Sequence, residues 1–214
     1  MPDRPITLLI TGFGPFPGAP FNPTELLLAR LARRRRPALM RVRAIHHVFP
    51  TSYAAVDAQL LALLKQHQPD AILMFGLAAR TKDIRIEMQA RNRRAQGFPD
   101  IDRAASTRAT IRSGAQVMRG RAPFTRLLAA ARKAGLRARL SRDAGSYLCN
   151  YVYWRALEAA ARPGGPAVIA FVHVPRLRSR SRRTGRSSAP TIDQLTQAAQ
   201  AIVLATAAAS RLCR

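Results

Sequence analysis

The sequence predicts an α/β protein in which helices cover both faces of a central sheet. Short apolar runs typical of buried strands alternate along the chain with longer segments of helical periodicity. Loops rich in glycine, proline or arginine separate these segments, and no internal repeat or linker divides the 214 residues. We therefore expect residues 1–214 to form a single domain.

Short apolar runs predict the strands. The first, residues 6–10, is expected to end at Thr11-Gly12, and the run at 71–75 is the best candidate for the centre of the sheet. Residues 84–88 alternate between apolar and charged side chains, as a half-buried strand does. The remaining strands are expected at residues 41–48, 136–140 and 167–174.

The helices are predicted from apolar periodicity and from their ends. Asn22 and Pro23 suit the start of the first helix, Thr51 or Ser52 is expected to cap the second, and Gly135 closes the third. The expected helices run from residue 23 to the arginine run at 33–36, and over residues 51–66, 124–135, 147–161 and 191–211. Segments 91–106 and 176–188, both polar, are expected to be loops.

The formal net charge of +25 is the unusual feature of the composition, and nearly all of it comes from arginine. Phosphate contacts in a nucleic-acid-binding protein would explain such a charge, and so would a codon usage that favours arginine. Arginines occur along the whole chain, with dense clusters at 33–36 and 176–186, and no helix-turn-helix, zinc module or aromatic RNA-binding strand is evident in the sequence. We expect no specific nucleic-acid partner, although non-specific contact with polyanions needs only the charge.

Membrane and redox signals point to a cytoplasmic protein. No apolar run reaches about 18 residues, so no membrane-spanning helix is expected, and the first residues lack the features of a signal peptide. The two cysteines, Cys149 and Cys213, do not make a disulfide framework. A reducing, cytoplasmic setting is the simplest interpretation.

Cys149 lies where a short, partly apolar segment meets the helix expected at 147–161. At a helix N-terminus the free N–H groups and the helix dipole favour an anion, so a thiol there ionises more readily. The same N–H groups can hold a developing oxyanion. The alternative is a small buried hydrophobic residue, which is the commoner role of a single cysteine.

His173 and Glu87 are the other candidates for chemistry. His173 is near the end of the strand 167–174, and catalytic groups in open α/β sheets collect at the carboxyl ends of strands. Taken alone, His173 is explained as a hydrogen-bonded histidine at a strand end, and Glu87 as the partner of a neighbouring arginine. Together with Cys149 they supply the nucleophile, base and orienting acid that thiol hydrolysis requires.

Four segments resemble motifs of the type I pyroglutamyl peptidases, also called pyrrolidone-carboxylate peptidases, a family of cysteine peptidases. Segments 11–18 and 22–24 resemble the opening motif T-G-F-x-P-F-G-G…N-P-[ST]. Segment 76–80, with Glu87 and Asn92, resembles G-Q-A-G-G-R…E-R-V-A-I-N. Segment 143–150 resembles the cysteine motif [ST]-A-G-T-[FY]-[VL]-C-N, and segment 171–175 resembles the histidine motif F-[IV]-H-[IV]-P. The motifs follow the family order and spacing, and the match extends from residue 6 to about residue 205.

The resemblance implies a fold, an activity and a site. The fold is a single-domain three-layer α/β/α sandwich around a twisted mixed sheet. Cys149 would be the nucleophile, His173 the base and Glu87 the orienting carboxylate in the removal of an N-terminal pyroglutamyl group from peptides, with no metal or cofactor. The partner is a peptide or N-acyl substrate, and the oligomeric state is left open, with a homo-oligomer as one option. The positions matched to the substrate pocket are Phe13, Phe16, Asn22, Leu77, Tyr147 and Leu148.

Two departures from the family motifs concern substrate recognition. Leu77 replaces the glutamine that hydrogen-bonds the lactam ring, so a bound pyroglutamyl group would lose roughly 1–3 kcal/mol through unpaired polar atoms. Gly97 replaces an arginine close to the reacting carbonyl, and a lost charged donor costs catalysis around 10²-fold. Shortly after Leu77, the family's G-G-R becomes Ala79-Arg80-Thr81, so the arginine is displaced by one position.

Three functions therefore remain open at the level of sequence. The first is a pyroglutamyl-type cysteine peptidase, and the second is a related thiol hydrolase with a different acyl preference. The third is a non-enzymatic binding protein on the same fold. Retention of the catalytic residue types favours the first two, and the loss of the glutamine at Leu77 separates the second from the first.

Overall fold

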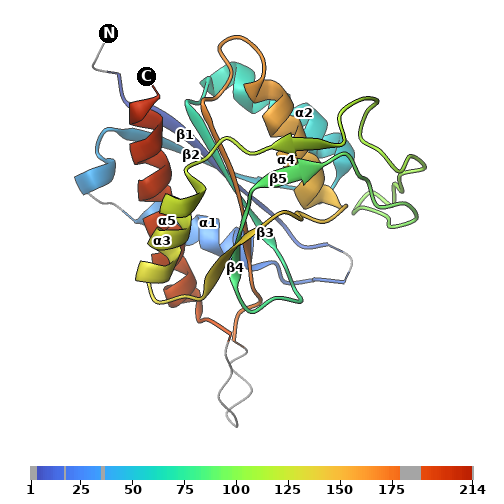
Figure 1. The fold of residues 1–214 in the computed structure, drawn as a ribbon. Helices are drawn as coiled ribbons and strands as arrows, with labels where there is room; N and C mark the ends of the chain where they lie inside the picture. The colour runs from blue at the N-terminus through green and yellow to red at the C-terminus, as the bar shows by residue number, and fades with distance from the viewer. Residues whose placement is uncertain (1–3, 17, 35–36, 179–188, 214) are drawn as a thin grey trace.

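The computed structural model describes residues 4–16, 18–34, 37–178 and 189–213 (Figure 1). Most of the arginine-rich segment predicted to be a loop, residues 179–188, lies outside the described residues. Among the described residues, no helix has the length and apolar character needed to cross a membrane.

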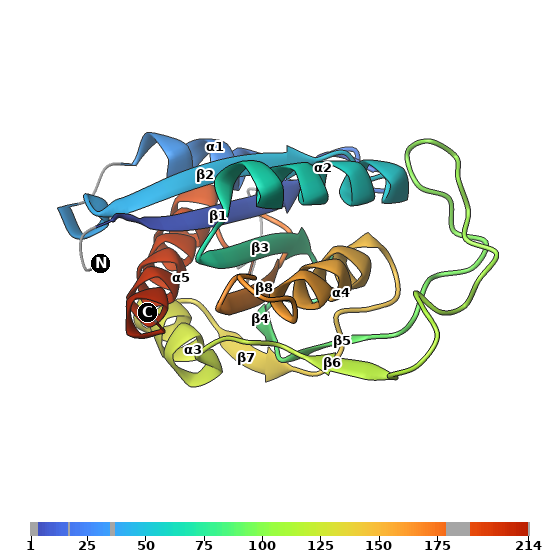
Figure 2. The ribbon, with the colours of Figure 1, turned by 90° about the horizontal axis from the view of Figure 1, so that it is seen from above.

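A six-stranded sheet lies at the centre, in the order β2-β1-β3-β8-β4-β7, which Figure 2 shows from above. Its strands are β1 (Ile6–Phe13), β2 (Val42–Phe49), β3 (Ala71–Leu77), β4 (Ile84–Glu87), β7 (Ala138–Ser141) and β8 (Val168–Val174). β2, β1, β3 and β8 pair in parallel, whereas β4 is antiparallel to β8 and parallel to β7. The sheet is therefore mixed, and the predicted α/β fold class is confirmed.

Five α-helices cover the two faces of the sheet. They are α1 (Pro23–Arg33), α2 (Tyr53–His67), α3 (Phe124–Lys133), α4 (Leu148–Ala160) and α5 (Ile192–Leu212). α1, α3 and α5 lie on one face and α2 and α4 on the other, as Figure 1 shows. A short 3₁₀ helix, η1 (Pro37–Leu39), precedes β2. The three layers match the sandwich that the family resemblance implied.

Each strand contributes to two cores because successive side chains point to opposite faces of a sheet. In β8, Val172 packs in the core under α1, α3 and α5, and its neighbour Phe171 packs in the core under α2 and α4. In β4, Ile84 and Ile86 pack in the first of these cores. The alternation therefore places Arg85 and Glu87 on the face that carries α4.

The predicted helix caps are present, and the structure decides between the alternatives. The side chain of Asn22 accepts a hydrogen bond from the amide of Thr24 at the start of α1. Ser52 is the cap of α2, since its hydroxyl accepts from the amide of Ala55 at 3.1 Å. Thr51, the other candidate, donates its hydroxyl hydrogen bonds to the backbone carbonyls of Gly14 and Pro15, in the loop that follows β1.

The predicted end of the first strand at Thr11-Gly12 was wrong. β1 continues to Phe13, with Gly12 opposite Val48 and Phe13 opposite Phe49 of β2. A Cβ atom at Gly12 would lie 3.1 Å from side-chain atoms of Thr24 in α1. The glycine allows α1 to pack closely on the strand, and does not end the strand.

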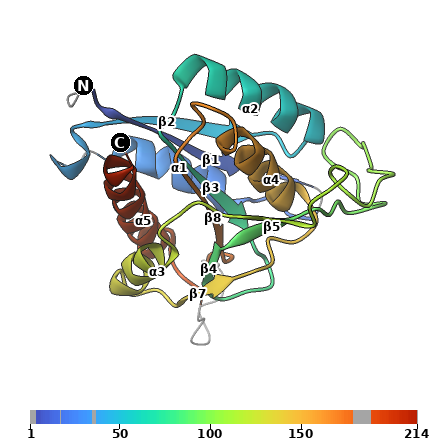
Figure 3. The ribbon, with the colours of Figure 1, turned by 45° about the horizontal axis from the view of Figure 1, so that its top comes forward.

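Two short strands were not predicted. β5 (Gln89–Arg91) pairs antiparallel with β6 (Val117–Arg119) in a separate two-stranded ladder. Each has only three residues, so neither produces an apolar run long enough to predict a strand. β5 lies beside α4 (Figure 3), and this contact bears on the site.

Candidate active site

A cavity of about 540 Å³ opens where β3 and β8 end and α4 begins. Its walls include Cys149 and His173, together with every residue that the resemblance assigned to the substrate pocket: Phe13, Phe16, Asn22, Leu77, Tyr147 and Leu148. Glu87 is not part of the wall, because it lies behind His173 and is fully buried. The sequence-predicted site residues are therefore brought to one place.

Cys149 occupies the second position of α4. Tyr147 is the N-cap residue, and among the described residues its side chain makes no capping hydrogen bond to the helix. The first N–H groups of α4 are thus not occupied by a cap, at the end of the helix where its dipole favours negative charge. Gly76 at the end of β3 gives the sulfur its space: a Cβ atom there would lie 2.7 Å from Cys149 Sγ.

His173 connects Cys149 to Glu87. Its Nδ1 atom is 2.8 Å from Glu87 Oε1, and its side chain interacts with Cys149, beside which it lines the cavity. Because Nδ1 faces Glu87, Nε2 is the ring atom left to face the sulfur. The antiparallel pairing of β4 and β8 produces this arrangement by placing Arg85 opposite His173 and Glu87 opposite Phe171.

The surroundings of His173 favour its protonated form. Burial alone would lower the pKa of His173, but the hydrogen bond and negative charge of Cys149, followed by those of Glu87, outweigh it and raise this pKa to about 9. Near neutral pH, His173 is therefore an imidazolium, with Glu87 at its Nδ1 atom and Cys149 on the other side of the ring. That state supports a proton-donating role.

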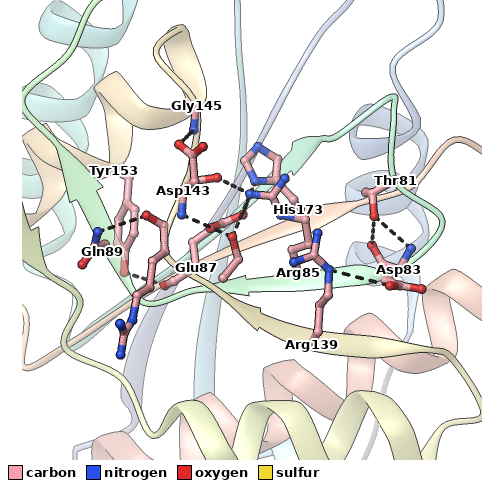
Figure 4. Close-up of polar contacts among 12 residues, drawn as sticks. Thr81, Asp83, Arg85, Glu87, Gln89, Arg139, Asp143, Gly145, Tyr153 and His173 are labelled. Atoms are coloured by element: carbon pink, nitrogen blue, oxygen red, sulfur yellow. Dashed lines mark hydrogen bonds and ion pairs between the residues drawn. The ribbon is translucent and has the colours of Figure 1, made fainter.

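Glu87 also forms the ion pair that its arginine-rich surroundings suggested. Arg85 Nη2 lies 3.0 Å from Glu87 Oε1, and the same nitrogen donates to Ser141 Oγ at 2.7 Å and to the carbonyl of Asp143 (Figure 4). Glu87 therefore contacts both the neighbouring arginine and His173. Arg85 links the acid to the segment that leads into Cys149.

Two further side chains attach α4 to the strands below it. Asn150 is fully buried; its amide nitrogen donates to the carbonyls of Arg91 and Arg93 at 2.7 and 3.0 Å, and its oxygen accepts from the Arg91 amide at 2.8 Å. The hydroxyl of Tyr153 donates to the Glu87 carbonyl at 2.9 Å. Sequence reasoning gave neither residue a role, although Asn150 directly follows the candidate nucleophile in a family motif.

One wall of the cavity is aromatic. The ring of Tyr147 lies 6.2 Å from that of Phe16 and 5.3 Å from that of Phe98, and its hydroxyl donates to the carbonyl of Pro99 at 3.0 Å. Burial, followed by the nearby Tyr53, raises the pKa of Tyr147 above its usual value, so its hydroxyl stays neutral. This wall suits a compact, uncharged acyl group.

The polar side chains predicted near the substrate differ in what they offer. Asn22 lines the cavity, but its amide donates to the carbonyl of Gly14 at 3.0 Å and its oxygen accepts from Thr24. Leu77 also lines the cavity and brings no polar atom to it. Gly97 has a φ of +68°, in the left-handed region that favours glycine, and is not among the lining residues.

The cavity contains lining residues that sequence reasoning did not assign to a site. These are chiefly Thr51, Arg80, Arg85 and Arg139. For Arg85 a signal existed, because its alternation with Glu87 places both side chains on one face of a strand. Among the residues that the structure describes, no group of three or more His, Cys, Asp or Glu side chains is arranged to hold a metal ion.

The α/β/α sheet carries a cysteine at the start of a helix, beside a histidine that is hydrogen-bonded to a buried glutamate. This arrangement defines a hydrolase of the cysteine-peptidase class. A family model described as pyroglutamyl peptidase matches residues 6–212. The chain belongs to the pyroglutamyl peptidase family.

Comparison with individual proteins leads to the same family. The chain is 33% identical over 188 residues to a pyrrolidone-carboxylate peptidase of Halalkalibacterium halodurans, covering 87% of this chain and 90% of that protein. It is 31% identical over 210 residues to the protein of that name from Clavibacter michiganensis, covering 94% and 93%. The solved pyrrolidone carboxyl peptidase of Thermococcus litoralis superimposes with a TM-score of 0.87 at 25% identity, covering 98% of this chain and 96% of that one.

Proposed function

We propose that this protein is a cysteine peptidase that removes an N-terminal pyroglutamyl group from peptides, with Cys149 as nucleophile, His173 as acid and base, and Glu87 as the group that orients His173. The observation that carries the proposal is the chain of contacts from Cys149 through His173 to the buried Glu87, at the edge of a cavity with an aromatic wall. Membership of the family supplies the substrate class.

The geometry accounts for the formation of an acyl-enzyme. The thiolate of Cys149 attacks the carbonyl carbon of the pyroglutamyl group, and a carbon–sulfur bond forms. The carbonyl electron pair moves to the oxygen, where the first N–H groups of α4 stabilise the negative charge. The imidazolium of His173 gives its proton to the leaving amine, the carbon–nitrogen bond breaks, and a thioester and a free peptide result.

Deacylation uses the same groups in the reverse sense. His173, now neutral, takes a proton from a water molecule, and the resulting hydroxide attacks the thioester carbonyl. The carbon–sulfur bond breaks, pyroglutamate leaves, and the thiolate and imidazolium are restored. Throughout, the bond from Nδ1 to Glu87 fixes the ring orientation and leaves Nε2 to carry the transferred proton.

A related thiol hydrolase with a different acyl group is the second candidate, and Leu77 is the observation that favours it. Leu77 lies in the cavity wall at the position of the lactam-binding glutamine implied by the resemblance. A ring with polar edges gains no hydrogen bond from this side chain, and a more apolar acyl group would lose nothing. A panel of fluorogenic N-acyl substrates separates the two candidates by their relative kcat/KM.

The test of the thiol mechanism is hydrolysis of a fluorogenic pyroglutamyl amide by the purified protein. Iodoacetamide and the substitution Cys149→Ser are expected to abolish turnover, because a serine hydroxyl is far less ionised than a thiol. The matched control is Cys213→Ser, since Cys213 is exposed at the end of α5 and should be dispensable. Full activity in Cys149→Ala would exclude covalent catalysis by this residue.

The proposal also covers the cellular location of the protein and its binding partner. We place the protein in the cytoplasm, where its two free cysteines would stay reduced. The expected partner is a peptide or N-acyl substrate that enters the cavity by its N-terminal end.

A further inference from the structure

Four residues from neighbouring strands form a row across the sheet at the level of the site. Gly76 of β3 is paired with His173 of β8, His173 with Arg85 of β4, and Arg85 with Arg139 of β7. Side chains directly opposite one another on adjacent strands point to the same face. His173, Arg85 and Arg139 therefore follow one another along the cavity, and all three line it (Figure 4).

The row divides the cavity into two ends with different chemistry. On one side of β8 lie β3 and β1, whose residues Leu77 and Phe13 belong to the apolar end. On the other side lie β4 and β7, with Arg85 and Arg139. The acyl group fits the apolar end, and His173 between the two ends delivers its proton to the leaving amine. The leaving peptide must then extend toward the arginines.

The charges at the arginine end do not cancel. Asp83 is shared between two arginines, with Arg137 Nε at 3.1 Å and Arg139 Nε at 3.7 Å. Arg85 is matched by Glu87, and among the described residues its buried Nε has no hydrogen-bond partner. Among Arg85, Arg137 and Arg139, one positive charge is thus left over beside the path of the leaving peptide, on an Arg139 side chain that is 51% exposed.

The acidic side chains nearby do not remove this charge. Asp143, which also lines the cavity, accepts a hydrogen bond from the amide of Gly145 at 3.1 Å and lies 3.7 Å from Arg91. Glu87 is enclosed by His173 and Arg85. A carboxylate supplied by a ligand is the group that this end of the cavity lacks.

We propose that Arg85 and Arg139 form a leaving-group subsite that binds a carboxylate on the residue directly after the pyroglutamyl group. This inference rests on the proposed function and specifies its substrate class. Adjacent strands lie about 4.8 Å apart, so Arg139 stands two strand spacings from His173, within reach of a single amino-acid residue and its side chain. The carboxylate is either an acidic side chain at that residue or, in a dipeptide, the chain terminus.

The experiment compares matched peptides that differ only in charge. Pyroglutamyl-Glu amide against pyroglutamyl-Gln amide tests a side-chain carboxylate, and pyroglutamyl-Ala against its amide tests the terminal one. The wild-type protein is expected to favour the acidic member of at least one pair by about three- to tenfold in kcat/KM at low salt, and less at high salt, because the pair is partly exposed. The pair that shows the preference identifies the source of the carboxylate.

Arg139→Gln is expected to bring this ratio close to one. Arg137→Gln is the matched control, because it removes the same charge and the same partner, Asp83, from a side chain that is 77% exposed and outside the cavity wall. The control should keep the wild-type ratio. Equal turnover of acid and amide in both pairs, or an equal loss of preference in both variants, would overturn the subsite and leave the proposed function intact.

If the wild-type protein cleaves no pyroglutamyl peptide, the proposed function fails and binding decides the subsite. Calorimetry with the same four peptides and Cys149→Ala then measures the acid-to-amide ratio of affinities without turnover. A ratio above one that Arg139→Gln removes and Arg137→Gln keeps supports the subsite. Equal affinity, or no binding at all, refutes it.

Discussion

Replacing Gly76 by alanine should strongly lower the activity of the enzyme while leaving it folded. A Cβ atom at this position would lie 2.7 Å from Cys149 Sγ and 2.8 Å from Cζ of Phe171, whereas ordinary contacts begin at 3.4 Å. Phe171 is fully buried between the sheet and α4, so the ring has little space to retreat. The sulfur, which borders the open cavity, is the atom that can move.

The size of the effect follows from that distance. The sulfur must move from 2.7 Å to at least 3.4 Å from the new Cβ atom, and a displacement approaching 1 Å in a reacting group costs on the order of 10² in rate. Overpacking of the core adds roughly 1–3 kcal/mol of destabilisation. Gly76→Ala should therefore lower kcat/KM about a hundredfold and lower the melting temperature by several degrees, since about 1 kcal/mol corresponds to 2–4 °C in a domain of this size.

The assay combines turnover of a fluorogenic pyroglutamyl amide with thermal unfolding and the rate of Cys149 alkylation. Ala170→Val is the matched control, because it enlarges a buried residue of the neighbouring strand on the opposite face, away from the sulfur. It should lower stability and keep the activity of the folded fraction. Wild-type kcat/KM in Gly76→Ala would refute the argument that the glycine determines the position of the sulfur.

Three further predictions concern the proton, the acyl group and the base of α4. Since the pKa of His173 is raised from 6.5 to about 9, the stabilisation from its protonated form is complete below pH 6.5 and is lost as the pH rises through about 9, and kcat/KM should decline over the same alkaline range. Glu87→Gln should move this decline to lower pH, as a pH–rate profile would reveal; an unchanged profile would contradict the role of Glu87. Leu77→Gln should raise kcat/KM for a pyroglutamyl substrate roughly 2- to 10-fold, by the net contribution of one hydrogen bond, and no gain together with efficient wild-type turnover would remove the altered-pocket hypothesis. Asn150→Ala leaves partly buried backbone groups of β5 unpaired and should cost about 1–3 kcal/mol in urea unfolding, where a loss below about 0.5 kcal/mol would show that β5 is held in other ways.

Much of the fold was predictable because its signals are local. The buried strands β1, β3 and β8 are continuous apolar runs, and the caps of α1 and α2 are side chains with a direct chemical reason to be there. β4, only four residues long, was predicted as residues 84–88 from a weaker signal, the alternation of apolar and charged side chains. The β5–β6 ladder was not, because three-residue strands depend on their partner and on α4 more than on their own sequence.

Some residues of the candidate site could likewise be predicted from the sequence, and others could not. Cys149, His173 and Glu87 were identified from their residue types, their places at a helix start and a strand end, and the family motifs. Arg139 was missed because its relation to His173 passes through two strand pairings between segments far apart in the chain. The register between such strands is set by tertiary packing, and the sequence pattern of either strand carries no record of it. The basic segment 176–186 drew attention by its charge, and most of it lies outside the described residues.

The two attachments of α4 have a mechanical consequence. The Asn150 side chain donates a hydrogen bond to the Arg91 carbonyl of β5, and the Tyr153 hydroxyl donates one to the Glu87 carbonyl of β4. The helix that carries Cys149 is therefore attached at both ends of the backbone segment 87–91. A side chain at Gly120, which faces Tyr153, would lie 2.0 Å from the hydroxyl of Tyr153 and break into this joint. These two hydrogen bonds therefore couple the position of the helix that bears Cys149 to that of the backbone that bears Glu87, so a shift of α4 is passed on to the strand of the acid.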